Sequence, residues 1–141
     1  MHALNNLCGS PHFGVRDLQR ACDLVLGELG SESGFWEDRR HHALPNGWYS
    51  HSVLAKAFDL LLPPTWKMLT AVARGCDWSR LGNPAVAGCL VNLHNAHWAS
   101  IAAYEGSVFY LDSLHLPVLI DEEDYLQIIR KHDVICFCGG A

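Results

Sequence analysis

The second half of the chain places apolar residues at every other position, and this pattern limits the possible folds more than any other feature. Four such runs, rich in β-branched and aromatic residues, are separated by turn signals or polar segments: 85–93, 97–104, 107–114 and 134–138. Glu105-Gly106 joins two of them, and glycine supplies the positive φ that a two-residue hairpin turn requires. The pattern predicts a mostly antiparallel sheet with tight connections.

The first half follows a helical period instead. Amphipathic or helix-compatible stretches are found at 2–7, 15–29 and 50–62, and a late one at 121–131. Ser50 is placed to cap the third of these. Helices first and a sheet afterwards predict an α+β fold, in which N-terminal helices pack on the sheet. The length of 141 residues suits a single domain, 1–141.

Two segments are harder to assign. The stretch 65–72 is compatible with either a strand or a helix. The polar stretch 31–47 reads as a loop or helical arm that carries the aromatic residues Phe35 and Trp36. A long connection of this kind is often functional.

Charge and composition exclude several classes of function. The formal net charge is −5 and no run of like charges is long enough for a nucleic-acid surface. No apolar run approaches the roughly 18 residues of a membrane span. No basic and apolar leader is found at the N-terminus, so a cytoplasmic or nuclear location is expected. The six cysteines are expected to be free thiols, and zinc binding with some of the nine histidines is the alternative.

The predicted hairpin brings two polar residues together. With the turn centred on Glu105-Gly106, the residue numbers of two directly opposed positions add up to about 211, so Asp112 lies opposite Ala99. His97 is then the next residue on the same face and a diagonal neighbour of Asp112, roughly 7–8 Å away between backbones. An aspartate on so apolar a strand needs a partner, and His97 is within reach.

A histidine oriented by a carboxylate is half of a nucleophilic triad. The carboxylate fixes the tautomer of the ring and leaves the other nitrogen to act as a base. In cysteine proteases the thiolate is placed at a helix N-terminus, where the helix dipole lowers its pKa. The alternative is a structural His–Asp pair that closes the sheet. His94 is expected at the surface.

Four blocks of sequence together resemble a known family: HALNNL at 2–7, NGWYSHSVLAKAF at 46–58, NAHWASI at 95–101 and FYLDSL at 109–114. As a set, and with the tail DYLQII…VICF, they resemble a Josephin domain. That family comprises papain-like cysteine proteases that remove ubiquitin from its conjugates. The resemblance covers nearly the whole chain. It implies a papain-like fold, with His97 as general base and Asp112 as the residue that orients it.

The resemblance also implies a nucleophilic cysteine three residues before His2, which falls ahead of Met1, and an oxyanion-stabilising glutamine further upstream. Cys8 lies at the wrong end of the first helix to replace that thiol. An N-terminally shortened domain and a natural pseudoenzyme both remain open. In either case the 141 residues as written are expected not to hydrolyse isopeptide bonds.

The resemblance predicts a ubiquitin-specific thiol protease with ubiquitin or ubiquitinated proteins as partners and with no cofactor or metal. A lid or cleft contact is expected from Phe35 and Trp36, and Trp98 is expected to pack beside the cleft or to line it. His41 and His42 are expected to be solvated, and Asn5 and Asn6 to bridge locally. The alternatives are a non-catalytic ubiquitin-binding module and another acyl transfer, such as cleavage after a Gly-Gly leader.

Overall fold

The computed structural model describes residues 2–8, 13–33, 39–61, 67–69, 78–81, 83 and 86–138. The helices are α1 (His2–Cys8), α2 (Val15–Ser33), α3 (His51–Leu61) and α4 (Glu122–Lys131), with short 3-10 turns η1 (Arg39–His41) and η2 (Trp78–Arg80). The strands are β1 (Lys67–Leu69), β2 (Val86–Leu93), β3 (His97–Tyr104), β4 (Ser107–Leu111), β5 (Val118–Ile120) and β6 (Asp133–Cys138).

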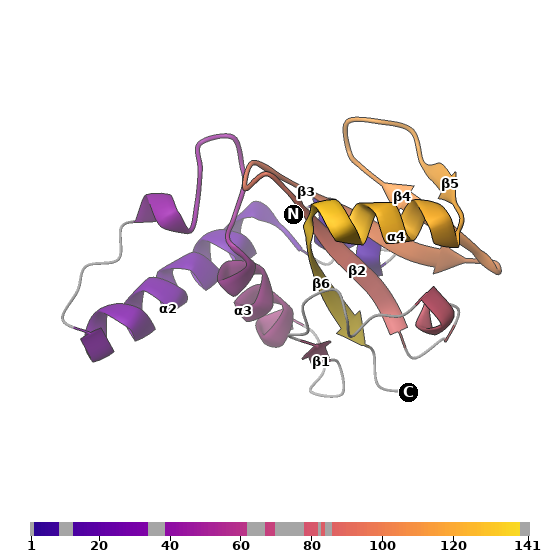
Figure 1. Ribbon diagram of the computed structural model, residues 1–141. Helices are drawn as coiled ribbons and strands as arrows, with labels where there is room; N and C mark the ends of the chain where they lie inside the picture. The colour runs from indigo at the N-terminus through magenta and orange to yellow at the C-terminus, as the bar shows by residue number, and fades with distance from the viewer. Residues whose placement is uncertain are drawn as a thin grey trace.

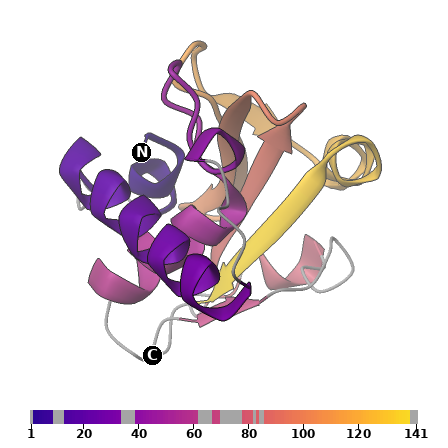
Figure 2. The same ribbon diagram turned by 90° about the vertical axis from the view of Figure 1, so that its left-hand side faces the viewer.

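The strands form one six-stranded sheet in the order β1-β6-β2-β3-β4-β5 (Figure 1). Every pairing between neighbours is antiparallel. The predicted α+β class with an antiparallel sheet is therefore confirmed. Of the described helices, α1 to α3 lie on one side of the sheet and α4 lies on the other (Figure 2).

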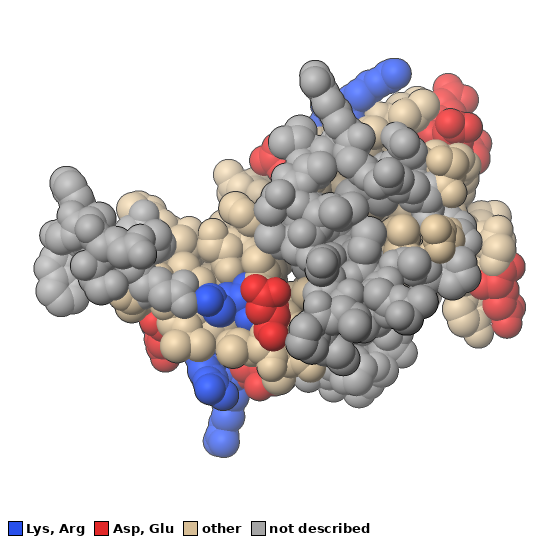
Figure 3. All heavy atoms as spheres, turned by 90° about the horizontal axis from the view of Figure 1, so that it is seen from below, with Lys and Arg blue, Asp and Glu red and all other residues tan. Residues whose placement is uncertain are grey.

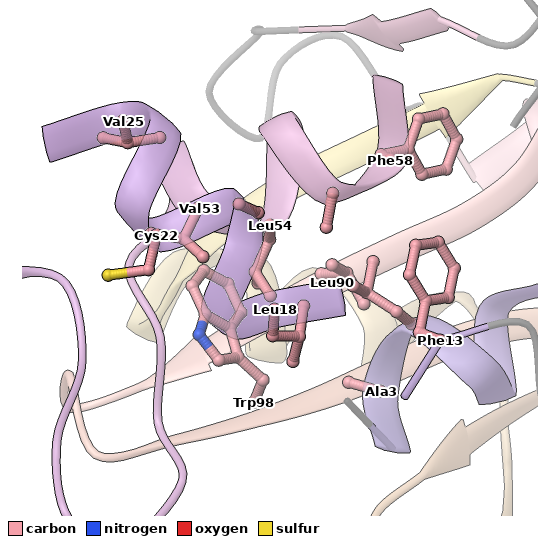
Figure 4. Close-up of a cluster of buried hydrophobic side chains, with 13 residues drawn as sticks. Ala3, Phe13, Leu18, Cys22, Val25, Val53, Leu54, Phe58, Leu90 and Trp98 are labelled. Atoms are coloured by element: carbon pink, nitrogen blue, oxygen red, sulfur yellow. The ribbon is translucent and has the colours of Figure 1, made fainter. Parts of the chain in front are cut away.

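Two hydrophobic cores fill the two sides of the sheet. Consecutive side chains of β2 divide between them, because strand residues point alternately to opposite faces. Leu90 packs with Leu4, Leu18 and Phe58 from the three N-terminal helices (Figure 4). Cys89 and Val91 pack on the α4 side, and the buried residues of that core are Leu81, Cys89, Val91, Ile101, Val108, Ile120, Tyr125 and Val134.

The helix starts follow local chemistry. Asp121 caps α4 in a full capping box with Asp124. The hydroxyl of Ser50 accepts from the N–H of Val53 at 3.4 Å, and its carbonyl accepts from Leu54, so the predicted cap of α3 is confirmed. The helix predicted at 15–29 continues to Ser33, so the first part of the predicted 31–47 arm is helical.

The sheet differs from the predicted strands at one end. The run 107–114 stops being a strand at Leu111, because Asp112 turns the chain: its carboxylate accepts from the N–H of Leu114 and its carbonyl accepts from the N–H of His115. The chain then returns as β5, which pairs with β4. In the unassigned stretch 65–72, residues 67–69 form a strand and the others lie outside the described residues.

Candidate active site

The hairpin of β3 and β4 brings His97 and Asp112 together. Ser100 pairs with Leu111 and Tyr104 with Ser107, which is the register predicted from the Glu105-Gly106 turn. His97 is the first residue of β3 and Asp112 directly follows β4. The Nε2 atom of His97 lies 2.8 Å from Oδ1 of Asp112, a hydrogen-bond distance.

Asp112 is buried, with 6% of its side chain exposed, and it is well supplied with donors. Its Oδ1 also accepts from the backbone N–H of Leu114 at 2.9 Å. Burial acts to raise the pKa of the Asp112 carboxyl, but the Leu114 N–H, the His97 ring and the nearby His115 outweigh it and lower that pKa. Asp112 is therefore a carboxylate over the physiological pH range.

An ionised carboxylate only accepts hydrogen bonds, so Nε2 of His97 must carry the proton. In the neutral ring this leaves the lone pair on Nδ1. The side chain of His97 is 31% exposed, in contrast to that of Asp112. His97 is therefore a candidate base: the buried Asp112 carboxylate fixes its tautomer through Nε2, and Nδ1 is left for proton transfer.

His97 lines a cleft of about 840 Å³ that it shares with the first turns of α1. His2 and Asn6 contribute one wall, and these residues lie four apart on one face of the helix. The cleft-lining residues are His2, Ala3, Asn6, Val15, Leu18, Asn46, Gly47, Trp48, Tyr49, Ala96, His97, Trp98, Ser113 and Leu114. The general-base candidate and the N-terminal end of a helix therefore face the same hollow.

Trp98 both packs in the core and lines this cleft. It is 9% exposed and lies among Leu18, Leu54 and Leu90 (Figure 4). Its indole N–H donates to the carbonyl of Tyr49 at 2.6 Å, and its ring stacks on Trp48 with an interplanar angle of 8°. The residue next to His97 is thus held rigidly, and this limits how far the start of β3 can move.

Three asparagines, which were not singled out in the sequence, fix the loops around the site. Asn46 donates to the carbonyl of Ala96 at 3.1 Å and accepts from the N–H of Trp48. Asn92 accepts from the N–H of Asn95 and donates to its side chain, which holds the turn before His97. The N-G pair at 46–47 was the available sequence signal for such a turn.

The prediction for His42 is wrong. Its side chain is buried, with 7% of the residue exposed, and Nδ1 lies 2.8 Å from the hydroxyl of Ser50. Ser50 also donates its N–H to the carbonyl of His42, so the loop folds back on the cap of α3. His41 is exposed as predicted, and Asn5 bridges to both backbone groups of Phe13.

Among the residues whose side chains are described, no thiol lines the cleft. Cys22 and Cys89 are buried, and burial raises the pKa of Cys22 despite the opposing effect of Arg39. Phe35, Trp36 and Met1 lie outside the described residues. Among the described residues no three His, Cys, Asp or Glu side chains come together as metal ligands. Within the same residues no helix is both long and apolar enough to span a bilayer.

No protein-family model matches this chain, and no curated protein matches it either. The function proposed below therefore rests on the residues of the chain and on their geometry.

Proposed function

We propose that this chain is the Josephin-type, papain-like domain of a cysteine protease that cleaves ubiquitin conjugates. The observation that supports the proposal best is the pair formed by His97 and Asp112, because it opens onto a cleft that also contains the first turns of α1. A base of this kind can activate a thiol, and a helix N-terminus is where a thiolate is favoured. The reducing compartments of the cytoplasm or nucleus suit a thiol enzyme.

The proposed reaction requires a cysteine three residues ahead of His2. Nδ1 of His97 would take the proton of that thiol, and the thiolate would attack the carbonyl carbon after the last glycine of ubiquitin. His97 would return the proton to the leaving amine, and Asp112 would hold the ring and stabilise the imidazolium. Water would then attack the thioester, with His97 again as base, and release the ubiquitin carboxylate and the thiol.

The test restores the cysteine to the chain. A version extended by Cys-Xaa before Met1 is compared with the same extension carrying Ser in place of Cys, and with the Cys extension combined with His97→Ala. Hydrolysis of a fluorogenic ubiquitin conjugate is measured, together with covalent capture by ubiquitin bearing a C-terminal electrophile. Both are expected only for the Cys extension with His97 intact. A folded Cys extension that matches the Ser version in both assays would contradict the proposal.

One observation favours a second candidate, a non-catalytic ubiquitin-binding module. The His97–Asp112 pair and the cleft are formed, whereas no thiol lines the cleft among the residues whose side chains are described. This candidate predicts that the unaltered chain shifts the NMR resonances of ¹⁵N-labelled ubiquitin, and that the Cys extension adds no hydrolysis. Absence of shifts at millimolar ubiquitin would remove it.

A further inference from the structure

The end of the β4–β5 connection and the first residues of β5 carry a run of exposed apolar side chains. Leu114 is 72% exposed, Leu116 85%, Val118 51% and Leu119 63%. Single exposed leucines are ordinary on protein surfaces, but four large apolar side chains within six residues are not. We call the segment 114–119 the apolar loop.

We propose that the apolar loop, with the acidic start of α4, is the surface that receives the folded body of ubiquitin while its tail lies in the cleft. This inference rests on the proposed function, and it adds the part of the molecule that recognises the substrate outside the cleft.

The first support is continuity with the cleft. Ser113 and Leu114 belong to the cleft wall, and Leu116 lies two residues further along the same loop. An extended tail of four residues spans only about 13 Å, so the folded protein attached to it must sit against the rim of the cleft. The apolar loop forms part of that rim.

The second support is that the apolar loop is anchored at both ends. Asp112 holds the first end through the N–H groups of Leu114 and His115. At the other end Val118 pairs with Tyr110 as β5 begins. Pro117 further restricts the backbone between them. A surface that is already ordered loses less conformational entropy when a partner binds, and this favours binding by the apolar loop.

The third support is charge. From Leu81 to Ile129 the sequence has no Lys or Arg, but it has six acidic residues: Glu105, Asp112, Asp121, Glu122, Glu123 and Asp124. In the view from below in Figure 3, Asp and Glu side chains lie along the right-hand edge, and Lys and Arg side chains lie near the top and further left. The complementary partner is a protein surface with an apolar centre and a basic border, and an anionic membrane or nucleic acid would be repelled.

A second hollow, of about 390 Å³, offers a place for an apolar anchor of the partner. It lies between the β4–β5 pair and α4. Its lining combines Tyr110, Val118, Ile120 and Ile128 with the polar residues Asp124, Gln127, Lys131 and His132. Val118 belongs both to this hollow and to the apolar loop. Interfaces commonly place their strongest contacts where one apolar side chain fills such a depression.

The experiment uses the 141-residue chain as it is and measures the Kd for ¹⁵N-labelled ubiquitin by NMR titration. Leu116→Asp is expected to weaken binding at least tenfold, because it puts a charge in the centre of the apolar surface. Leu60→Asp on α3 is the matched control, since Leu60 is exposed (42%) but remote in sequence from the loop, and it is expected to change Kd less than twofold. Thermal unfolding of each variant checks that the fold is kept.

A charge variant tests the acidic border separately. Glu122→Gln with Glu123→Gln leaves the Asp121–Asp124 capping box intact and is expected to weaken binding about threefold, and to reduce its dependence on salt. Equal affinities for the wild type and Leu116→Asp would overturn the docking surface and leave the protease proposal standing. Leu116-dependent binding without hydrolysis by the Cys extension would keep the surface and remove the protease. No binding by the wild type at millimolar ubiquitin would overturn the surface.

Discussion

Two histidines of this chain make the same kind of contact and differ in almost everything else. His97 and His42 each place a ring nitrogen 2.8 Å from a side-chain oxygen, of Asp112 and of Ser50 respectively. His42 is buried in the helical half, whereas His97 keeps 31% of its side chain exposed at a cleft. The hydrogen bond alone therefore does not identify a functional histidine. A histidine at a cleft, whose second ring nitrogen is free to exchange a proton, is the better candidate.

The hydroxyl oxygen of Ser50 and the carboxylate oxygen of Asp112 also have different structural roles. Ser50 caps α3, so its contact with His42 ties a loop to the start of a helix. The buried carboxylate of Asp112 accepts from His97 and from the N–H of Leu114, so its contact with His97 orients a ring that faces solvent. From this we expect His42 to contribute to stability and His97 to chemistry.

The largest expected effect is that of His97→Ala in the Cys-extended chain. Loss of the base should lower kcat/KM for a ubiquitin substrate by at least about 10³-fold, while the free energy of unfolding changes by about 1 kcal/mol. Steady-state kinetics and urea denaturation provide the two readouts. If the variant kept a tenth of the wild-type kcat/KM, His97 would not be the base of the reaction.

Replacement of Asp112 should come next and should depend on the substitute. Asp112→Leu removes the acceptor for both His97 and the Leu114 N–H, and we expect about 10²-fold lower kcat/KM and about 2–3 kcal/mol lower stability. Asp112→Asn keeps an Oδ1 that can accept both bonds, so it should retain activity within about tenfold. Equal losses in the two variants would show that the charge, and not the acceptor, is what matters.

For His42→Ala the expected pattern is reversed. The buried ring and its bond to Ser50 are lost, so the free energy of unfolding should fall by about 2 kcal/mol. kcat/KM of the Cys-extended chain should stay within about threefold. Ser50→Ala, which removes the cap as well as the bond, should cost about 1–2 kcal/mol and serves as the companion variant.

The smallest expected effect is the pH dependence of the stability that Asp112 contributes. The pKa of Asp112 is lowered in the folded protein, so its ionised form contributes stability in full above the unfolded pKa of about 3.9. That contribution is lost as the pH falls through the lower, folded pKa. The stability difference between wild type and Asp112→Asn should therefore narrow as the pH falls below about 4.

Asp59→Asn is the control for this titration, because it removes an exposed carboxyl on α3. A difference between wild type and Asp112→Asn that persists unchanged to pH 2 would contradict the lowered pKa.

The His97–Asp112 pair was predictable because it depends on local rules. A two-residue turn sets the register of a hairpin, and the register decides which side chains share a face. The same rules place β3 at 97–104 without error. The helices were predictable from their apolar period, although the end of α2 was set four residues too early.

His42 and β5 were not predictable because they depend on contacts distant in sequence or on very short segments. His42 lies in a polar stretch, and it is buried where its loop folds back on Ser50 at the start of α3. β5 has three residues after a proline and exists because β4 provides a partner. The cleft, too, is formed by α1, the 46–49 loop and the β3–β4 hairpin. Local sequence patterns do not predict which distant segments will meet.

Beyond β4 the described sheet ends with β5, a strand of only three residues. An outer strand presents unpaired backbone groups to which another chain can add, and the risk of aggregation grows with the length of that strand. With so short an outer strand, two copies of this protein have little backbone along which to pair at β5. Fibrous aggregation through the β5 edge should therefore be disfavoured in concentrated samples, although several leucines are exposed on the nearby surface.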